Sequence, residues 1–75
     1  MSWRDRITTQ PTVCHGKPCF VGTRVMVSVV LDNLASGRSI EQVLADYPSV
    51  TREDVLAALA FAADLTRERD MPRSA

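Results

Sequence analysis

The residues of this sequence best suited to metal binding or nucleophilic chemistry are Cys14, His15 and Cys19, because two thiols and one imidazole fall within six positions. A structural zinc site takes four ligands, and the sequence has no further Cys or His to complete the set. A Cys–His nucleophile pair is the other chemistry that these residues could support, but neighbours in a strand point to opposite faces. We therefore expect no metal site, but small buried thiols and a surface imidazole.

Two further patterns resemble functional motifs without completing them. Gly16-Lys17 resembles the end of a phosphate-binding loop, but the upstream glycine is missing and Pro18 stands where Ser or Thr would hold magnesium. Glu53 and Asp54 are adjacent carboxylates, and a helix N-terminus explains them because its dipole favours acids there. No catalytic constellation emerges, so we expect neither an enzyme nor a cofactor.

Length and composition limit the classes of protein to which this chain can belong. A chain of 75 residues is the size of a single small domain, and 45% hydrophobic with 24% charged residues is typical of a globular fold. Nine basic residues balance nine acidic ones, which argues against the broad electrostatic grip of a strongly basic nucleic-acid binder. The start lacks an apolar signal run and no stretch of 18 apolar residues occurs, so we expect a cytoplasmic protein.

The N-terminal part predicts a β segment at about residues 7–27. Gly22-Thr23 separates two short runs of strand-forming residues. A glycine first in a two-residue turn is typical of a type II′ hairpin, so residues 19–21 should pair with residues 24–26.

Two helices are expected next, with clear start and stop signals. Apolar residues recur with the helical period from Val27, and Gly37 should end that helix as its C′ residue. Ser39 and Gln42 have the spacing of a capping box, which opens the second helix. Pro48 should end it.

A third helix is expected with Thr51 as its N-cap and an end near residue 69. It completes a helical bundle at about residues 27–69, and residues 70–75 should fray.

The apolar residues of this third helix predict two buried faces. At about 100° per residue they cover roughly 260° of its circumference, far more than a helix packed on one side needs. The face assigned to the chain's own core consists of Val55, Leu56, Leu59 and Ala63. The face assigned to the interface of a homodimer or another partner consists of Ala58, Phe61, Ala62 and Leu65. An alternative stays open, in which the N-terminal hairpin covers that second face within one monomer.

Four runs of residues, by their order and spacing, carry a family resemblance: Gly16-Lys17-Pro18, Gly22-Thr23-Arg24, the stretch from Gly37 to Pro48, and the stretch from Thr51 to Leu59. From about Ile7 to Ala63 the chain resembles the bacterial domain-of-unknown-function 433 family. The resemblance implies a mostly α fold, with a short N-terminal β-hairpin before a three-helix, homeodomain-like or winged helix-turn-helix bundle. It also implies similarity to antitoxins of type II toxin-antitoxin pairs, whose partner is often a PIN-like ribonuclease. His15 departs from the family pattern, which usually has glycine there.

A helix-turn-helix layout raises the question of DNA contact. If the third helix entered a major groove, its first residues would approach the bases, while its neighbouring acids would be repelled by phosphate. Contacts from scattered cations to the DNA backbone fit the neutral charge balance better. The candidate DNA-contact residues are Lys17, Arg24, Arg38, Ser49, Thr51 and Arg52.

Two functions of different classes stay open at this point. The first is an antitoxin-like regulatory module that dimerises, binds a cognate toxin such as a PIN-like ribonuclease, and could contact operator DNA. The alternative is a protein-interaction adaptor with no role in DNA binding.

Overall fold

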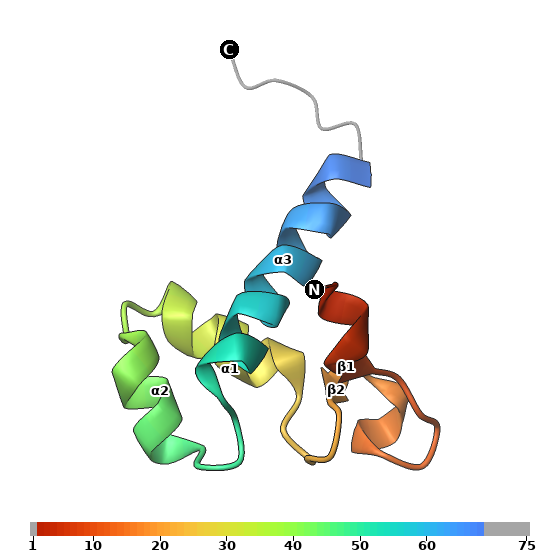
Figure 1. The fold of residues 1–75 in the computed structure, drawn as a ribbon, viewed down its shortest axis with the longest axis horizontal. Helices are drawn as coiled ribbons and strands as arrows, with labels where there is room; N and C mark the ends of the chain where they lie inside the picture. The colour runs from red at the N-terminus through yellow and green to blue at the C-terminus, as the bar shows by residue number, and fades with distance from the viewer. Residues whose placement is uncertain (1, 69–75) are drawn as a thin grey trace.

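Helices dominate the computed structural model, which describes residues 2–68 (Figure 1). In chain order the described elements are the 3₁₀ turn η1 (Trp3–Asp5), β1 (Ile7–Thr8), the 3₁₀ turn η2 (Cys14–Gly16), β2 (Cys19–Phe20), α1 (Val27–Ala35), α2 (Ile40–Asp46) and α3 (Arg52–Glu68). Figure 1 shows the last turns of α3 extending away from the other elements. The predicted fold class, a short antiparallel strand pair followed by three helices, is confirmed. The predicted frayed tail at residues 70–75 lies outside the described residues.

The strand pair differs from the predicted one in its partners. β1 and β2 pair antiparallel, so the start of the chain supplies the strand that the sequence analysis placed after the turn. The predicted pairing of residues 19–21 with 24–26 survives as one isolated bridge, between Cys19 and Met26. The ladder stops there because α1 begins at the next residue.

The turn after β2 also differs in type. The amide of Thr23 donates to the carbonyl of Phe20 at 3.0 Å, which puts Gly22 at the third position of the turn. Gly22 has φ 79°, and a positive φ at that position is typical of a type II turn rather than type II′. The Thr23 hydroxyl stabilises the turn, donating to the Phe20 carbonyl at 2.9 Å and accepting from the Val25 amide at 3.1 Å.

The predicted end of α1 and start of α2 are confirmed, and both depend on residues close together in the sequence. Gly37, with φ 97°, ends α1 in a Schellman motif, in which its own amide and that of Arg38 donate to carbonyls of the last turn. At the start of α2 the Ser39 hydroxyl accepts from the Gln42 amide at 3.1 Å. The Gln42 side chain in turn accepts from the Ser39 amide at 2.8 Å, so the predicted capping box is present.

The start of α3 is tied to the N-terminal segment. Thr51 and Asp54 cap the helix reciprocally, because each side chain accepts from the backbone amide of the other, at 3.2 and 3.0 Å. The Asp54 carboxylate also accepts from Nη1 of Arg6 at 3.1 Å. The buried Asp54 carboxylate therefore accepts from both the Thr51 amide and Arg6, and it fixes η1 and β1 against the first turn of α3.

The core lies where the N-terminal half of α3 meets α1, α2 and the strand pair. Its buried apolar residues are Ile7, Phe20, Val27, Val30, Val43, Val50, Val55, Ala57 and Ala58. The predicted core face of α3 is partly wrong, since Leu56 and Leu59 are 54% and 42% exposed. Helix α3 instead buries Val55 and Ala58, because the other helices and η1 pack on that side. Ala58, predicted at a partner interface, is part of the chain's own core.

Candidate protein interface on helix α3

The side of α3 that faces away from the core is apolar. Leu56, Leu59 and Ala60 are exposed on it and Ala63 is half-buried, and we call these four residues the outer face. Their spacing of i, i+3, i+4 and i+7 places them on one side of the helix. A surface helix normally turns such a stripe towards the core, but here the opposite side forms the core. An apolar stripe left in solvent is the feature that marks interaction surfaces.

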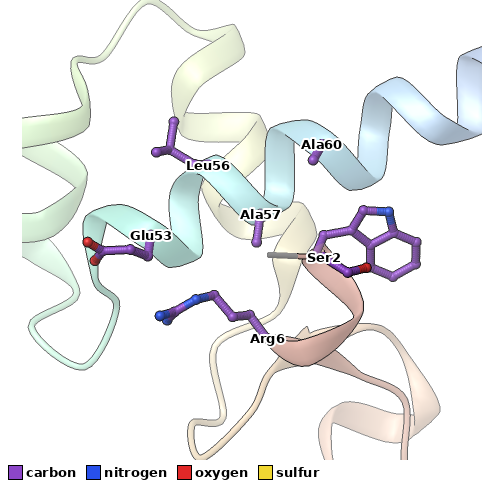
Figure 2. Close-up of a pocket in the computed structure, with 7 residues that line it drawn as sticks. Ser2, Arg6, Glu53, Leu56, Ala57 and Ala60 are labelled. Atoms are coloured by element: carbon purple, nitrogen blue, oxygen red, sulfur yellow. The ribbon is translucent and has the colours of Figure 1, made fainter.

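A pocket of about 360 Å³ adjoins the outer face, between η1 and the N-terminal half of α3 (Figure 2). It is lined by Ser2, Trp3, Arg6, Glu53, Leu56, Ala57 and Ala60. Figure 2 shows Arg6 and Glu53 towards the end where α3 begins, with Ala60 farther along the helix. Because Leu56 and Ala60 belong to both, the pocket continues the outer face and could receive an apolar side chain of a bound protein.

Trp3 holds η1 beside α3 and so forms one wall of this pocket. Its ring packs edge-on against Phe61, with centroids 4.9 Å apart and an interplanar angle of 72°. Its indole nitrogen donates a hydrogen bond to Asp64. That bond, together with the guanidinium of Arg67, keeps the pKa of Asp64 below its ordinary value. The pocket therefore depends on contacts between the two ends of the described chain.

The four residues predicted at a partner interface do not form one surface. Ala58 is buried in the core, Phe61 packs against the core and Trp3, and Ala62 is half-buried. Leu65 is 45% exposed, but it lies about 180° around the helix from Leu56. The structure therefore separates Leu65 from the outer face.

Two of the predicted DNA-contact cations are paired with acids of their own fold. Arg38 bonds the Asn33 side chain at 3.0 Å and forms an ion pair with Asp46 at the end of α2. Arg52 forms an ion pair with Glu41 of α2, and this contact lowers the pKa of Glu41. Both guanidinium groups thus join helix ends within the bundle, although each stays accessible to solvent.

The other candidates are exposed. Lys17 and Arg24 have no side-chain hydrogen bond or ion pair within residues 2–68. A hydrogen bond from the Cys14 thiol to the Arg24 carbonyl, at 3.3 Å, brings the η2 turn next to Arg24. Ser49 and Thr51 lie in the turn before α3, and the Thr51 hydroxyl is used by the helix cap.

The η2 turn carries unusual backbone geometry. Cys14 and His15 have φ of 53° and 55°, in the left-handed region that side chains other than glycine rarely adopt. His15 is exposed, whereas Cys19 is buried, and burial raises the pKa of the Cys19 thiol. Within residues 2–68 no group of three or more His, Cys, Asp or Glu side chains is arranged to hold a metal ion.

Helices α2 and α3, with the turn between them, have the order of a helix-turn-helix unit. If α3 entered a DNA groove with its exposed side, that side would present Arg52 in the first turn and then the apolar side chains of Leu56 and Leu59. Base edges in a major groove are hydrogen-bonding groups, and apolar side chains there find only the thymine methyl. The outer face is thus poorly suited to reading bases and well suited to packing against protein.

Sequence reasoning missed the outer face because it assigned both leucines to the core. One signal could have identified it. The charged residues Arg52, Glu53 and Arg67 fall on the same side of the helical wheel as Leu56, and charges of this kind mark the solvent side.

A comparison with known proteins adds family relationships. A family model described as "Protein of unknown function (DUF433)" matches residues 7–62. The uncharacterized protein y4eO of Sinorhizobium fredii (strain NBRC 101917 / NGR234) is 36% identical over 59 residues, which cover 79% of this chain and 27% of that protein. This chain thus spans about a quarter of the length of the curated relative.

A solved structure has the same fold. The crystal structure of a DUF433 member protein from Anabaena variabilis ATCC 29413, at 2.00 Å resolution, superposes with a TM-score of 0.76 and 28% sequence identity. The match covers 87% of this chain and 64% of that one. Within residues 2–68 of the present chain, no helix has both the length and the apolar character needed to cross a membrane.

Proposed function

The chain belongs to the DUF433 family, and we propose that it is an antitoxin-like, protein-binding regulatory module that assembles through the outer face of α3. The observation that carries this proposal is the exposure of Leu56 and Leu59, at 54% and 42%, on a helix whose opposite side forms the core. Two large exposed aliphatic side chains next to an apolar pocket support a role in docking protein.

The energetics favour a protein partner over a DNA groove. Fully burying a leucine side chain contributes about 1.5–3 kcal/mol, so covering the exposed half of each leucine contributes roughly 1 kcal/mol. In a DNA groove most of that contribution would be lost, because the polar base edges would lose water without gaining a partner.

The cognate partner that we propose is a toxin of a type II pair, such as a PIN-like ribonuclease, in keeping with the family resemblance. The chain itself acts without catalysis in this proposal. An operator contact is a second candidate function, favoured by the cations Lys17 and Arg24 near the η2 turn, which are exposed and have no side-chain partner within residues 2–68. It would use the DNA backbone rather than base edges.

The proposed surface is tested by expressing this protein together with the adjacent gene and purifying the untagged complex of the two products. The double variant Leu56→Ser/Leu59→Ser should lose the complex, because it removes the apolar surface. Leu65→Ser is the matched control, since it changes a leucine of similar exposure on another side of the same helix. A complex that survives the double variant and is lost in Leu65→Ser would overturn the proposed surface.

A second arm addresses the function itself. The wild-type protein should neutralise the growth arrest caused by the neighbouring gene product when both are expressed. Folded wild-type protein that neither binds nor neutralises that product would overturn the antitoxin-like role.

A further inference from the structure

The outer face belongs to a longer stripe with a coiled-coil spacing. Glu53, Leu56, Ala60, Ala63 and Arg67 are separated by three, four, three and four residues, the alternation of a and d positions in a heptad repeat. At about 100° per residue these five positions fall within roughly 80° of the helix circumference. Leu59 flanks the stripe on one side, and the pocket beside η1 flanks it on the other.

The two charged ends of this stripe are placed symmetrically about the middle of the helix. Helix α3 runs from Arg52 to Glu68, so Ala60 lies at its midpoint. Glu53 and Arg67 lie seven residues before and after Ala60, with opposite charge. Small residues at the centre of such a stripe allow two helix backbones to approach closely, while the leucines supply the apolar contact.

The charges determine which orientation of a second α3 fits. In a parallel pair of identical helices, Glu53 would face Glu53 of the second copy, and the arginines would face one another. In an antiparallel pair with its two-fold axis at Ala60, Glu53 faces Arg67 of the second copy, twice over. The antiparallel pair also places the N-terminus of each helix beside the C-terminus of the other, so that the two helix dipoles attract each other.

Intrachain contacts leave these two groups available. The Glu53 side chain makes no hydrogen bond or ion pair within residues 2–68. Arg67 bonds Asp64 through Nη2, and a guanidinium has further donors for a second carboxylate. Arg52, the other cation at the start of the helix, is already neutralised by Glu41.

We propose that the outer face of α3 binds a second copy of this chain, as an antiparallel two-fold helix pair centred on Ala60 with Glu53–Arg67 ion pairs at both ends. The inference rests on the proposed function, because it names the first occupant of the same surface. The second copy then covers the outer face, and the cognate partner binds the resulting dimer at another surface, so its complex depends on Leu56 and Leu59 through the dimer.

The experiment is sedimentation equilibrium of the full chain and of charge-reversed variants. Wild-type protein should dimerise at micromolar concentration. Glu53→Arg and Arg67→Glu should each raise the dimer dissociation constant by roughly tenfold or more, since each places like charges at both ends of the pair. The double variant Glu53→Arg/Arg67→Glu should recover wild-type affinity. Asp32→Arg, a charge reversal on the exposed side of α1, is the control and should change nothing.

Mixing the two single variants separates this arrangement from a loss of folding. One chain then carries two arginines and the other two glutamates at positions 53 and 67, so an equimolar mixture should form a heterodimer with wild-type affinity. A chain that merely fails to fold would not recover on mixing, and circular dichroism of each single variant checks this directly.

The outcomes also separate this inference from the proposed function. Wild-type protein that stays monomeric at 100 µM overturns the inference, as does a dimer that neither single variant weakens. If that monomer still binds the neighbouring gene product through Leu56 and Leu59, the proposed function stands without the inference. If the dimer behaves as expected but no neighbouring gene product binds, the inference stands and the antitoxin-like role fails.

Discussion

The indole N–H of Trp3 donates to the carboxylate of Asp64, a residue 61 positions farther along the chain. This bond and the edge-on contact of Trp3 with Phe61 hold η1 against the C-terminal half of α3. They explain why one side of α3 is covered by η1 while the outer face stays open.

Acid should loosen this contact. The hydrogen bond from Trp3, followed by the contact with Arg67, lowers the pKa of Asp64 from its ordinary value of 3.8. The stabilisation is therefore fully present above about pH 4 and is lost as the pH falls through the folded-state pKa. The difference in thermal midpoint between wild type and Asp64→Asn should be constant from pH 7 to 5 and should shrink below pH 4. A difference that stays constant down to pH 2 would contradict this role.

Asp54 should be the acid on which the fold depends most. Replacing it with Ala removes the carboxylate that accepts from the Thr51 amide at the start of α3 and that pairs with Arg6, so the free energy of unfolding should fall by about 1–3 kcal/mol. Asp32→Ala, an exposed aspartate in the middle of α1, should change it by less than about 0.5 kcal/mol. Urea unfolding of both variants measures these changes in unfolding free energy. Equal losses in the two variants would refute the structural role given to Asp54.

His15→Gly should stabilise the protein. His15 has φ 55° and ψ 34° with an exposed side chain, and left-handed geometry costs a residue other than glycine about 1–2 kcal/mol. The greater freedom of glycine in the unfolded chain offsets part of this, which leaves a gain of about 0.5–1 kcal/mol. Thermal unfolding is the measurement, and a lower midpoint for His15→Gly would show that the side chain has a role not visible in its contacts.

Any binding to operator DNA should depend on Arg24 more than on Arg52. Arg24 is unpaired within residues 2–68, whereas Arg52 is neutralised by Glu41. In gel-shift assays over a range of salt concentrations, Arg24→Ala should lower the salt slope by about one for each lost phosphate contact. Arg52→Ala should leave the slope unchanged. The reverse result would point to base reading by α3.

The sequence predicted those features that depend on neighbouring residues. The capping box of Ser39 and Gln42 and the Gly37 helix end involve backbone groups only a few residues away, so residue types and spacing suffice. The 260° apolar arc of α3, an approximate figure from helical periodicity, indicated that more than one side is apolar. It could not tell which side meets the core, because that depends on where α1, α2 and η1 pack against the helix, and these contacts join residues far apart in sequence.

The candidate site was harder to predict for the same reason. Leu56 and Leu59 look like core residues by type, and only the packing of α1, α2 and η1 on the opposite side leaves them exposed. The ion pairs of Arg38 and Arg52 likewise need the placement of α2 before their acidic partners are known.

Solvent accessibility of individual leucine methyl groups tests the central claim, that the outer face of α3 is covered by protein in the assembled state. A soluble paramagnetic agent broadens the NMR signals of exposed methyl groups, and the comparison is between dilute protein and the assembled state. The methyl signals of Leu56 and Leu59 should lose this broadening on assembly, while those of Leu65 and Val21, also exposed in the chain, should keep it. Protection of Leu65 with Leu56 and Leu59 still broadened would contradict the claim.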